Sequence, residues 1–406
     1  MKYYVGSRCC SIVKYWGTLC IVLLQVSIAN AQFSLKIELN SLPPSHTGEA
    51  VFIAGNFNSW NPGSDGYRFI REHDKLFLEI KNLSAGNYEF KFTRGSWNKV
   101  ECREDGHDIS NHYMNLSGDS SVIFSIAGWA DDFTKAPKQH TVSTQVQIID
   151  SAFKIPQLNR ERRIWLYLPE GYNKNKKRYP VLYMQDGQNV FDNYTSGYGE
   201  WGVDECLDSL IESGKPACIV VGIDNGNDKR MSEYNPYEFT MHDSALSITF
   251  EPEGDAYVDF LAKTLKPYID KKYRTLPSKE NTIVAGSSMG GLIAYYAMLK
   301  YPAVFGKAGI FSPAFWTASG LDAATDSLGD NLSGKLFFYM GEPEGKKYVD
   351  DMISIQEKIG KNSSAVIYSV IDPEGRHNEA AWQKWFPAFY TWIMAEGTNV
   401  PGGLNP

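Results

Sequence analysis

Short runs of alternating apolar and polar residues characterise the chain between residues 33 and 126. Examples are residues 51–54 and 88–92, and clusters of turn-forming residues separate the runs. Alternation with a period of two is typical of strands that bury one face and expose the other. The pattern predicts a small all-β, immunoglobulin-like sandwich over residues 32–127.

Continuous apolar runs alternate with helical segments from residue 143 onward. The runs expected to be strands are 163–168, 180–185, 218–223, 282–286, 307–311, 335–340 and 365–371. The segments with apolar residues at helical spacing are 255–273, 292–301 and 380–394. Strands that alternate with helices form mostly parallel sheets that are covered on both faces. The sequence therefore predicts an α/β domain over residues 143–396.

Three segments outside these patterns have other expected roles. Residues 1–31 carry three basic residues, a short apolar stretch and the small-x-small ending Ala29-Asn30-Ala31, which together are typical of an export signal. Residues 128–142 lack apolar periodicity and are expected to be a linker, and residues 397–406 a C-terminal tail. The apolar stretch is shorter than the roughly 20 residues that cross a bilayer. We expect a mature protein that is secreted or periplasmic and has no membrane span.

Charge and cysteine content narrow the expected partners. Removal of the signal would take away three positive charges and no negative ones, which changes the formal net charge from −7 to −10. Without a basic run the chain is a poor partner for nucleic acid. Cys102, Cys206 and Cys218 would remain, too few for a disulfide framework. Cys206 and Cys218 could form a bridge or be buried free thiols.

A Gly-x-Ser-x-Gly motif lies between a predicted strand and a predicted helix. It reads Gly286-Ser287-Ser288-Met289-Gly290. The turn from strand to helix is so tight that a Cβ at either glycine would clash, and it lifts the serine above the edge of the sheet. Ser288 is therefore the predicted nucleophile.

A serine nucleophile needs a general base, and histidine is the usual one because its pKa is near neutral. Of the seven histidines, five belong to the first domain or the linker, which leaves His242 and His377. Only His377 follows the serine, in a loop between a predicted strand and an aromatic-rich helix. The order serine then histidine is that of α/β-hydrolases. His377 is therefore the predicted base.

An acid should orient the imidazole, and it should follow the penultimate strand. Glu342 and Glu344 compete for this role after strand 335–340. Further alternatives are Asp350, Asp351 and Asp372.

Two backbone N–H groups are the predicted donors to the oxyanion of an acyl-transfer intermediate. One is that of Met289, at the start of the helix, where the helix dipole adds favourable charge. The other is that of Gln188, in the loop after strand 180–185, where Gly187 lets the backbone turn closely.

Taken together with segments 180–192 and 233–236, these motifs make residues 143–396 resemble the putative esterase family. That family takes in esterase D, ferulic acid esterases and siderophore esterases. The resemblance implies an α/β-hydrolase fold and ester hydrolysis. In the siderophore-esterase-like branch a Gly-x-x-Glu segment follows the penultimate strand, which favours Glu344 over Glu342. One departure is Asp186, where many relatives have histidine before the glycine.

The first domain resembles the starch- and glycogen-binding modules. Its motifs include Gly55 to Pro62, the strand 88–92 and the segment Gly95-Ser96-Trp97. The resemblance implies that tryptophans stack on glucose rings, because an indole offers a flat apolar face to a sugar. The residues expected to bind carbohydrate are Trp60, Trp97, Lys91 and Asn111. The alternative is that Trp60 is a structural residue of the sandwich.

These observations predict a serine carboxylic-ester hydrolase that acts on carbohydrate-linked acyl or phenolic esters. Within the enzyme class the alternative is a siderophore trilactone esterase. Outside it, the alternative is a glycan-binding protein with an inactive hydrolase scaffold. Lys229 and Arg230 form a basic pair that could meet an acidic substrate or simply be solvated. We find no spacing of metal ligands and no nucleotide or flavin motif, so no metal or other cofactor is expected.

Overall fold

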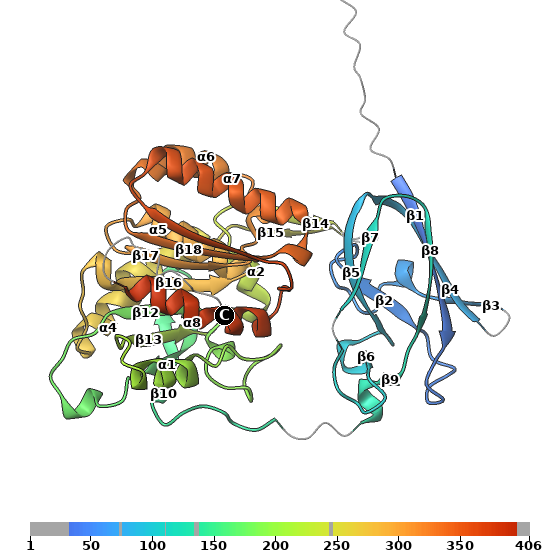
Figure 1. The fold of residues 1–406 in the computed structure, drawn as a ribbon, viewed down its shortest axis with the longest axis horizontal. Helices are drawn as coiled ribbons and strands as arrows, with labels where there is room; N and C mark the ends of the chain where they lie inside the picture. Colours follow the sequence, from blue (N-terminus) through green and yellow to red (C-terminus); the bar gives the residue numbers. More distant parts are fainter. Residues whose placement is uncertain (1–31, 73–74, 110, 134–137, 243–246, 396–406) are drawn as a thin grey trace, which may run out of the picture.

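The computed structural model describes residues 32–72, 75–109, 111–133, 138–242 and 247–395. The predicted export signal and the predicted C-terminal tail lie outside these residues. A β-sandwich, drawn from blue to cyan, is followed along the chain by a larger α/β part, drawn from green to red (Figure 1). The fold class predicted from the sequence is confirmed.

Two sheets and a short ribbon build the sandwich. Its strands are β1 (Gln32–Ser41), β2 (Phe52–Gly55), β3 (Ile70–Glu72), β4 (Lys75–Ser84), β5 (Gly86–Thr93), β6 (Glu101–Cys102), β7 (His112–Leu116), β8 (Ser120–Ser125) and β9 (Gly128–Trp129). One sheet has the order β3-β4-β1-β8, the second has the order β2-β5-β7, and β6 pairs with β9. Leu35, Ile37 and Leu39 of β1 are buried against Phe90 and Phe92 of β5. The apolar residues that recur with a period of two in the sequence therefore line the core face of β1.

The sandwich continues past residue 127, where the sequence pattern placed its end. Gly128 and Trp129 form β9, which pairs with β6. Trp129 is 1% exposed and belongs to the sandwich core. The predicted linker 128–142 therefore begins too early, because a single large side chain fills the core there without any periodic pattern.

An eight-stranded sheet forms the centre of the α/β part. Its strands are β10 (Val146–Ile155), β11 (Arg160–Tyr167), β12 (Val181–Gln185), β13 (Ile219–Ile223), β16 (Thr282–Ser287), β17 (Lys307–Phe311), β18 (Lys335–Gly341) and β19 (Val366–Asp372). Their order is β10-β11-β13-β12-β16-β17-β18-β19. β10 and β11 run antiparallel, and the strands from β13 to β19 in this order are parallel. The carboxyl ends of the parallel strands therefore meet at one edge.

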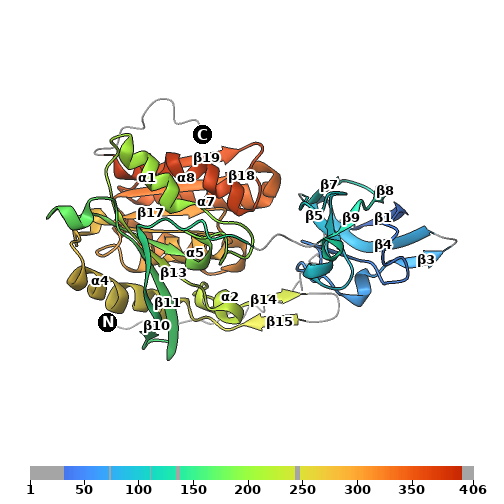
Figure 2. The ribbon, with the colours of Figure 1, turned by 90° about the horizontal axis from the view of Figure 1, so that it is seen from below.

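Helices cover both faces of this sheet. They are α1 (Val203–Glu212), α2 (Arg230–Glu233), α3 (Gly254–Phe260), α4 (Lys266–Lys272), α5 (Met289–Lys300), α6 (Leu321–Leu328), α7 (Lys346–Asn362) and α8 (Glu379–Met394), and a π-turn, Leu261–Leu265, joins α3 to α4. One core contains side chains of α3 to α7, and a second core contains those of α1 and α8. In Figure 2, α1 and α8 lie on one side of the sheet and α4 on the other. α5 is buried all round except at Lys300, as its uniformly apolar sequence requires.

A hairpin, β14 (Phe239–His242) and β15 (Ser247–Phe250), projects from the α/β part. Neither it nor β10 was expected from the sequence. No helix among the described residues is long and apolar enough to cross a membrane. Within the described part of the chain, Cys102, Cys206 and Cys218 form no disulfide, so Cys206 and Cys218 are not bridged.

Candidate active site

Ser288 lies in a strained turn between β16 and α5. Its φ of 58° and ψ of −123° are uncommon for a residue with a side chain, because the Cβ crowds the backbone there. A Cβ on Gly286 would lie 2.7 Å from the carbonyl oxygen of Gly290. The Ser288 N–H donates to the carbonyl of Phe311 at 2.9 Å, and the Ala314 N–H donates to the carbonyl of Ser288 at 3.1 Å. The end of β17 and the loop after it thus hold the strained turn on both sides.

Glu344 and His377 are hydrogen-bonded across the same edge of the sheet. Glu344 ends the short helix η11 (Glu342–Glu344) after β18, and His377 lies in the loop after β19. Nδ1 of His377 donates to Oε2 of Glu344 at 2.6 Å. The other carboxylate oxygen, Oε1, accepts from the N–H of Gly341 at 2.9 Å and from the hydroxyl of Ser312 at 2.6 Å. Glu344 is 9% exposed, so three donors compensate the burial of its charge.

The other acids considered for this role have different partners. Glu342 is exposed, one residue beyond Gly341. Asp350 and Asp351 form ion pairs within α7, with lysines four residues earlier. Asp372 accepts from the indole N–H of Trp385 at 2.7 Å. Only Glu344 among these acids has a hydrogen bond to His377 in the described structure.

The pKa of His377 is raised above its usual value. Burial alone would lower this pKa, but the charge of Glu344 and its hydrogen bond raise it more, and the charges of Glu379 and Glu89 add to the effect. The His377 side chain is 43% exposed, whereas that of Glu344 is 3% exposed. The imidazole can therefore meet a substrate while the carboxylate behind it stays shielded.

The two predicted oxyanion donors occupy the first turns of helices. Met289 is the first residue of α5, and Gln188 lies in the short helix η5 (Gly187–Asn189) after β12. The first N–H groups of a helix have no partner within it. A Cβ on Gly187 would lie 2.7 Å from the backbone of Gly222, so only glycine allows this close approach. These N–H groups are free of helical bonding, as the role requires.

Asp186, which precedes this turn, is engaged in a buried ion pair. It is 6% exposed, with a left-handed φ of 55°. Arg230 donates from Nε and Nη2 to its two oxygens at 2.7 and 2.9 Å, and Asn225 donates to it at 2.7 Å. Opposite charge at this distance raises the pKa of Arg230 against the effect of burial. Arg230 is therefore held by the protein and is not simply solvated.

The four residues expected to bind carbohydrate divide into two groups. The rings of Trp60 and Trp97 lie 6.3 Å apart, and Trp97 is 42% exposed. Lys91 donates to a backbone carbonyl at 2.6 Å, and Asn111 donates to Glu89 at 3.0 Å. The two polar side chains are thus occupied by protein partners, whereas an indole surface is open to solvent.

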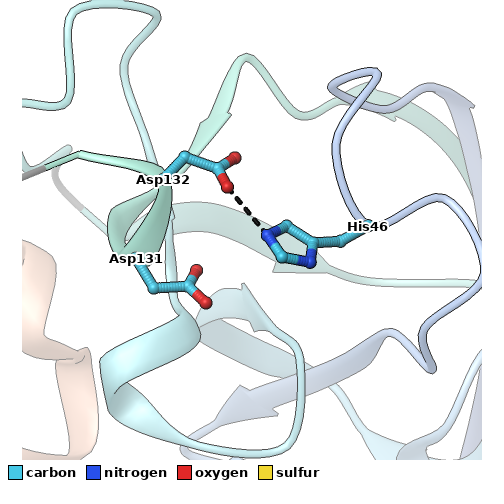
Figure 3. A group of neighbouring side chains, drawn as sticks. All are labelled: His46, Asp131 and Asp132. Carbon is cyan, nitrogen blue, oxygen red and sulfur yellow. Dashed lines mark hydrogen bonds and ion pairs between the residues drawn. The ribbon is translucent and has the colours of Figure 1, made fainter.

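His46, Asp131 and Asp132 form the one cluster in the described part of the chain that could hold a metal ion by residue type and spacing (Figure 3). His46 lies 2.8 Å from Asp132 through Nε2 and 2.8 Å from Glu49 through Nδ1. Asp131 pairs with Arg94, whose side chain is fully buried. Both ring nitrogens of His46 thus face carboxylates, and a guanidinium also faces the cluster.

Comparison with known proteins places this geometry in a family. The model of the putative esterase family matches residues 155–393. The chain belongs to the putative esterase family. This membership makes the α/β part a hydrolase domain of esterase type, in agreement with the resemblance seen in the sequence.

Three similar proteins differ in how much of this chain they match. The uncharacterized protein YbbA of Bacillus subtilis (strain 168) is 28% identical over 210 residues, which cover 52% of this chain and 78% of YbbA. The endo-1,4-beta-xylanase/feruloyl esterase of Xylanibacter ruminicola is 32% identical over 153 residues, 36% of this chain and 19% of that protein. The enterobactin esterase FES of Shigella flexneri aligns with a TM-score of 0.50 at 16% identity, over 85% of this chain and 88% of its own. The last similarity concerns the fold alone.

Several residues at this edge of the sheet were not singled out from the sequence. Glu379 is 7% exposed, and burial and the charge of Asp186 raise its pKa. Ser312 and Trp382 lie behind Glu344. Glu379 directly follows the helix cap Asn378, at a position where acids commonly stabilise a helix through its dipole. Its position in the sequence therefore does not mark it as a functional residue.

Proposed function

We propose that this esterase-family protein is a serine carboxylic-ester hydrolase with Ser288 as nucleophile, His377 as general base and Glu344 as the acid that orients the base. The observation that carries the proposal is the 2.6 Å bond between His377 and Glu344. It stands at the same sheet edge as a serine with a φ of 58° at the start of a helix. A strained serine followed by a helix, with an imidazole held by a buried acid, is the arrangement that acyl transfer needs.

The chemistry follows from these positions. Oγ of Ser288 attacks the ester carbonyl while His377 takes the hydroxyl proton. The N–H groups of Met289 and Gln188 stabilise the oxyanion of the tetrahedral intermediate. As the intermediate collapses, His377 gives the proton to the departing alcohol and an acyl-serine remains. Water, activated by the same histidine, then releases the acid and restores Ser288.

Carbohydrate-linked acyl or phenolic esters are the substrate class that we propose. The partial relative from Xylanibacter is named an endo-1,4-beta-xylanase/feruloyl esterase, and its identity with this chain is 32% over the matched residues. A siderophore trilactone is the second candidate. The enterobactin esterase of Shigella flexneri aligns in fold over 85% of this chain, more than the α/β part alone. Assays must separate the two substrate classes.

Glycan binding by the sandwich and export of the chain are further parts of the proposal. The half-open pair of Trp60 and Trp97 supports a sugar-stacking surface. In pull-down with insoluble starch or xylan, Trp97→Ala should reduce the bound fraction of the mature protein. Equal binding by the variant would reject the surface.

The export signal is tested by sequencing the N-terminus of protein recovered outside the cytoplasm, which should begin at Gln32.

The decisive experiment compares the protein with Ser288→Ala and with the matched control Ser287→Ala. Hydrolysis of 4-nitrophenyl acetate should fall by about 10⁴-fold or more in Ser288→Ala. Ser287, buried in β16 and 6% exposed, should tolerate the same change. Equal losses in both variants, or retained hydrolysis in Ser288→Ala, would reject the nucleophile.

The same proteins should then be assayed on methyl ferulate, on an acetylated glycan and on a cyclic trilactone siderophore. The highest kcat/KM should be on a ferulate or a glycan ester. A preference for the trilactone would replace the proposed substrate class by the siderophore class. No turnover of any ester would leave the inactive-scaffold hypothesis.

A further inference from the structure

A chain of buried hydrogen bonds extends behind Glu344, away from His377. The indole Nε1 of Trp382 donates to Oγ of Ser312 at 2.9 Å, and Oγ of Ser312 donates to Oε1 of Glu344 at 2.6 Å. Ser312 is 1% exposed and Trp382 is 4% exposed, so water does not compete for these bonds. The three residues come from the end of β17, from η11 and from α8.

The direction of the bonds is fixed by chemistry. An indole N–H can only donate, so the Ser312 oxygen must accept from Trp382. The proton of the Ser312 hydroxyl is then directed to Glu344, which as a carboxylate can only accept. Together with the N–H of Gly341, this leaves Oε1 with two donors and turns Oε2 toward His377.

Ser312 has an uncommon backbone conformation that serves this position. Its φ is 41°, in the left-handed region that residues with a side chain seldom adopt. Its N–H donates to the carbonyl of Tyr339 at 2.7 Å. Phe311, directly before it, and Ala314, two residues after it, bond the backbone of Ser288. Local strain that the surrounding structure maintains is common at functional sites.

Trp382 also contacts the base directly. Its ring meets that of His377 edge to face, with centroids 5.2 Å apart at 83°. On its other side it stacks with Trp201 at 5.8 Å. One side chain therefore limits the tilt of the imidazole and orients the hydroxyl that holds the acid.

We infer that Ser312 is a positioning residue of the hydrolytic site, that its hydroxyl orients and stabilises the Glu344 carboxylate for His377, and that Trp382 sets the direction of that hydroxyl. This inference rests on the proposed serine-esterase function. It adds two residues, 70 positions apart in the chain, to the groups on which the reaction depends.

Loss of the hydroxyl has an expected effect on rate and on pH dependence. Glu344 without the Ser312 donor carries more of its charge at Oε2, so the pKa of His377 should rise further. The acidic limb of the kcat/KM profile should move to higher pH, because the neutral imidazole then forms only at higher pH. The other charged groups that face His377, Glu379 and Glu89, remain unchanged. With a hydrogen bond to a charged group removed, kcat should fall about 10-fold with KM nearly constant.

The test uses Ser312→Ala and Ser312→Gly in the full chain. Glycine removes the same hydroxyl but accepts a positive φ without strain, so it separates the bond from the backbone conformation. Both variants should have a lower kcat, and the acidic limb of their kcat/KM profile should move to higher pH. Trp382→Phe removes the N–H and, because a phenyl ring is smaller than an indole, part of the ring contacts; it should give a smaller loss of about threefold. Its control is Trp165→Phe, which makes the same reduction in ring size and loses a partly buried indole bond of 2.7 Å to Asp224 instead of the bond to Ser312.

Thermal unfolding of each variant completes the test. A lower melting temperature with an unchanged limb in both Ser312 variants would assign Ser312 a purely structural role and overturn the inference. A wild-type kcat together with an acidic limb at the wild-type pH in both Ser312 variants would overturn it as well. If Ser312→Ala does not fold, the glycine and Trp382 variants carry the same expectation. Loss of hydrolysis in Ser288→Ala beside unaffected Ser312 variants would reject the positioning role alone, whereas retained hydrolysis in Ser288→Ala would reject the proposed function.

Discussion

Glu344 and Asp186 are two buried carboxylates at the same edge of the sheet, and their surroundings differ in one respect. Each follows a parallel strand, and each accepts three hydrogen bonds between 2.6 and 2.9 Å. Asp186 receives two of them from the permanent cation Arg230. Glu344 receives two from neutral groups and the third from His377, whose charge depends on pH.

This difference decides whether each negative charge is neutralised by its own partner or acts on a neighbouring group. A guanidinium that binds both oxygens neutralises Asp186 locally, and the pair shapes the turn that carries Gln188. None of the three donors to Glu344 is a permanent cation. Its charge therefore acts on the imidazole of His377 and raises the pKa of that group. Two carboxylates of similar burial thus serve stability in one case and, in our proposal, catalysis in the other.

The largest effect should follow removal of the charge that faces His377. In Glu344→Gln, kcat for ester hydrolysis should fall by about 10³-fold or more, because the amide neither orients the imidazole nor stabilises its cation. The melting temperature should change little in comparison. Steady-state kinetics and thermal unfolding measure the two.

Glu342→Gln is the matched control, since Glu342 is exposed and two residues away. It should retain wild-type kcat. A loss in Glu342→Gln as large as that in Glu344→Gln would mean that the acid assigned to His377 is wrong.

Removal of the other charge should change stability more than chemistry. Asp186→Asn leaves Arg230 without its counter-ion, and one uncompensated charge in a largely buried pair costs about 2 kcal/mol, allowing for an Arg230 side chain that is 23% exposed. Urea unfolding measures this loss. Asp350→Asn breaks an exposed ion pair in α7 and should cost less than about 0.5 kcal/mol. Equal costs in the two variants would mean that the Asp186–Arg230 pair stabilises the fold no more than an exposed ion pair does.

Sequence patterns predicted the central strands and the turn at Ser288 because these depend on local features. β12, β13, β16 and β18 are buried at every residue and therefore read as continuous apolar runs. β10 was missed because it lies at the edge of the sheet, where most of its residues remain partly or fully exposed. The turn after β16 was found because its glycines and serine lie within five positions.

The hydrogen bonds behind the site could not be predicted in the same way. Only the family resemblance favours Glu344 over Glu342, since both follow the same strand. Ser312 and Trp382 meet because β17 lies next to β18 and α8 packs across them, which is a matter of strand order. Neither residue has a local motif that distinguishes it from other serines and tryptophans.

The smallest effect should come from Glu379, an acid near the imidazole that has no hydrogen bond to it in the described structure. Its charge is one of those that raise the pKa of His377. A raised pKa means that the neutral base forms only at higher pH, so Glu379→Gln should move the acidic limb of kcat/KM to lower pH. The shift should be about a few tenths of a unit, because the pKa of Glu379 is itself raised and its charge is partly lost at acidic pH. Glu374→Gln, which changes an exposed acid of the loop that carries His377, should leave the limb in place. A shift as large as that of Glu344→Gln would show that proximity of charge, and not the hydrogen bond, sets the pKa of the base.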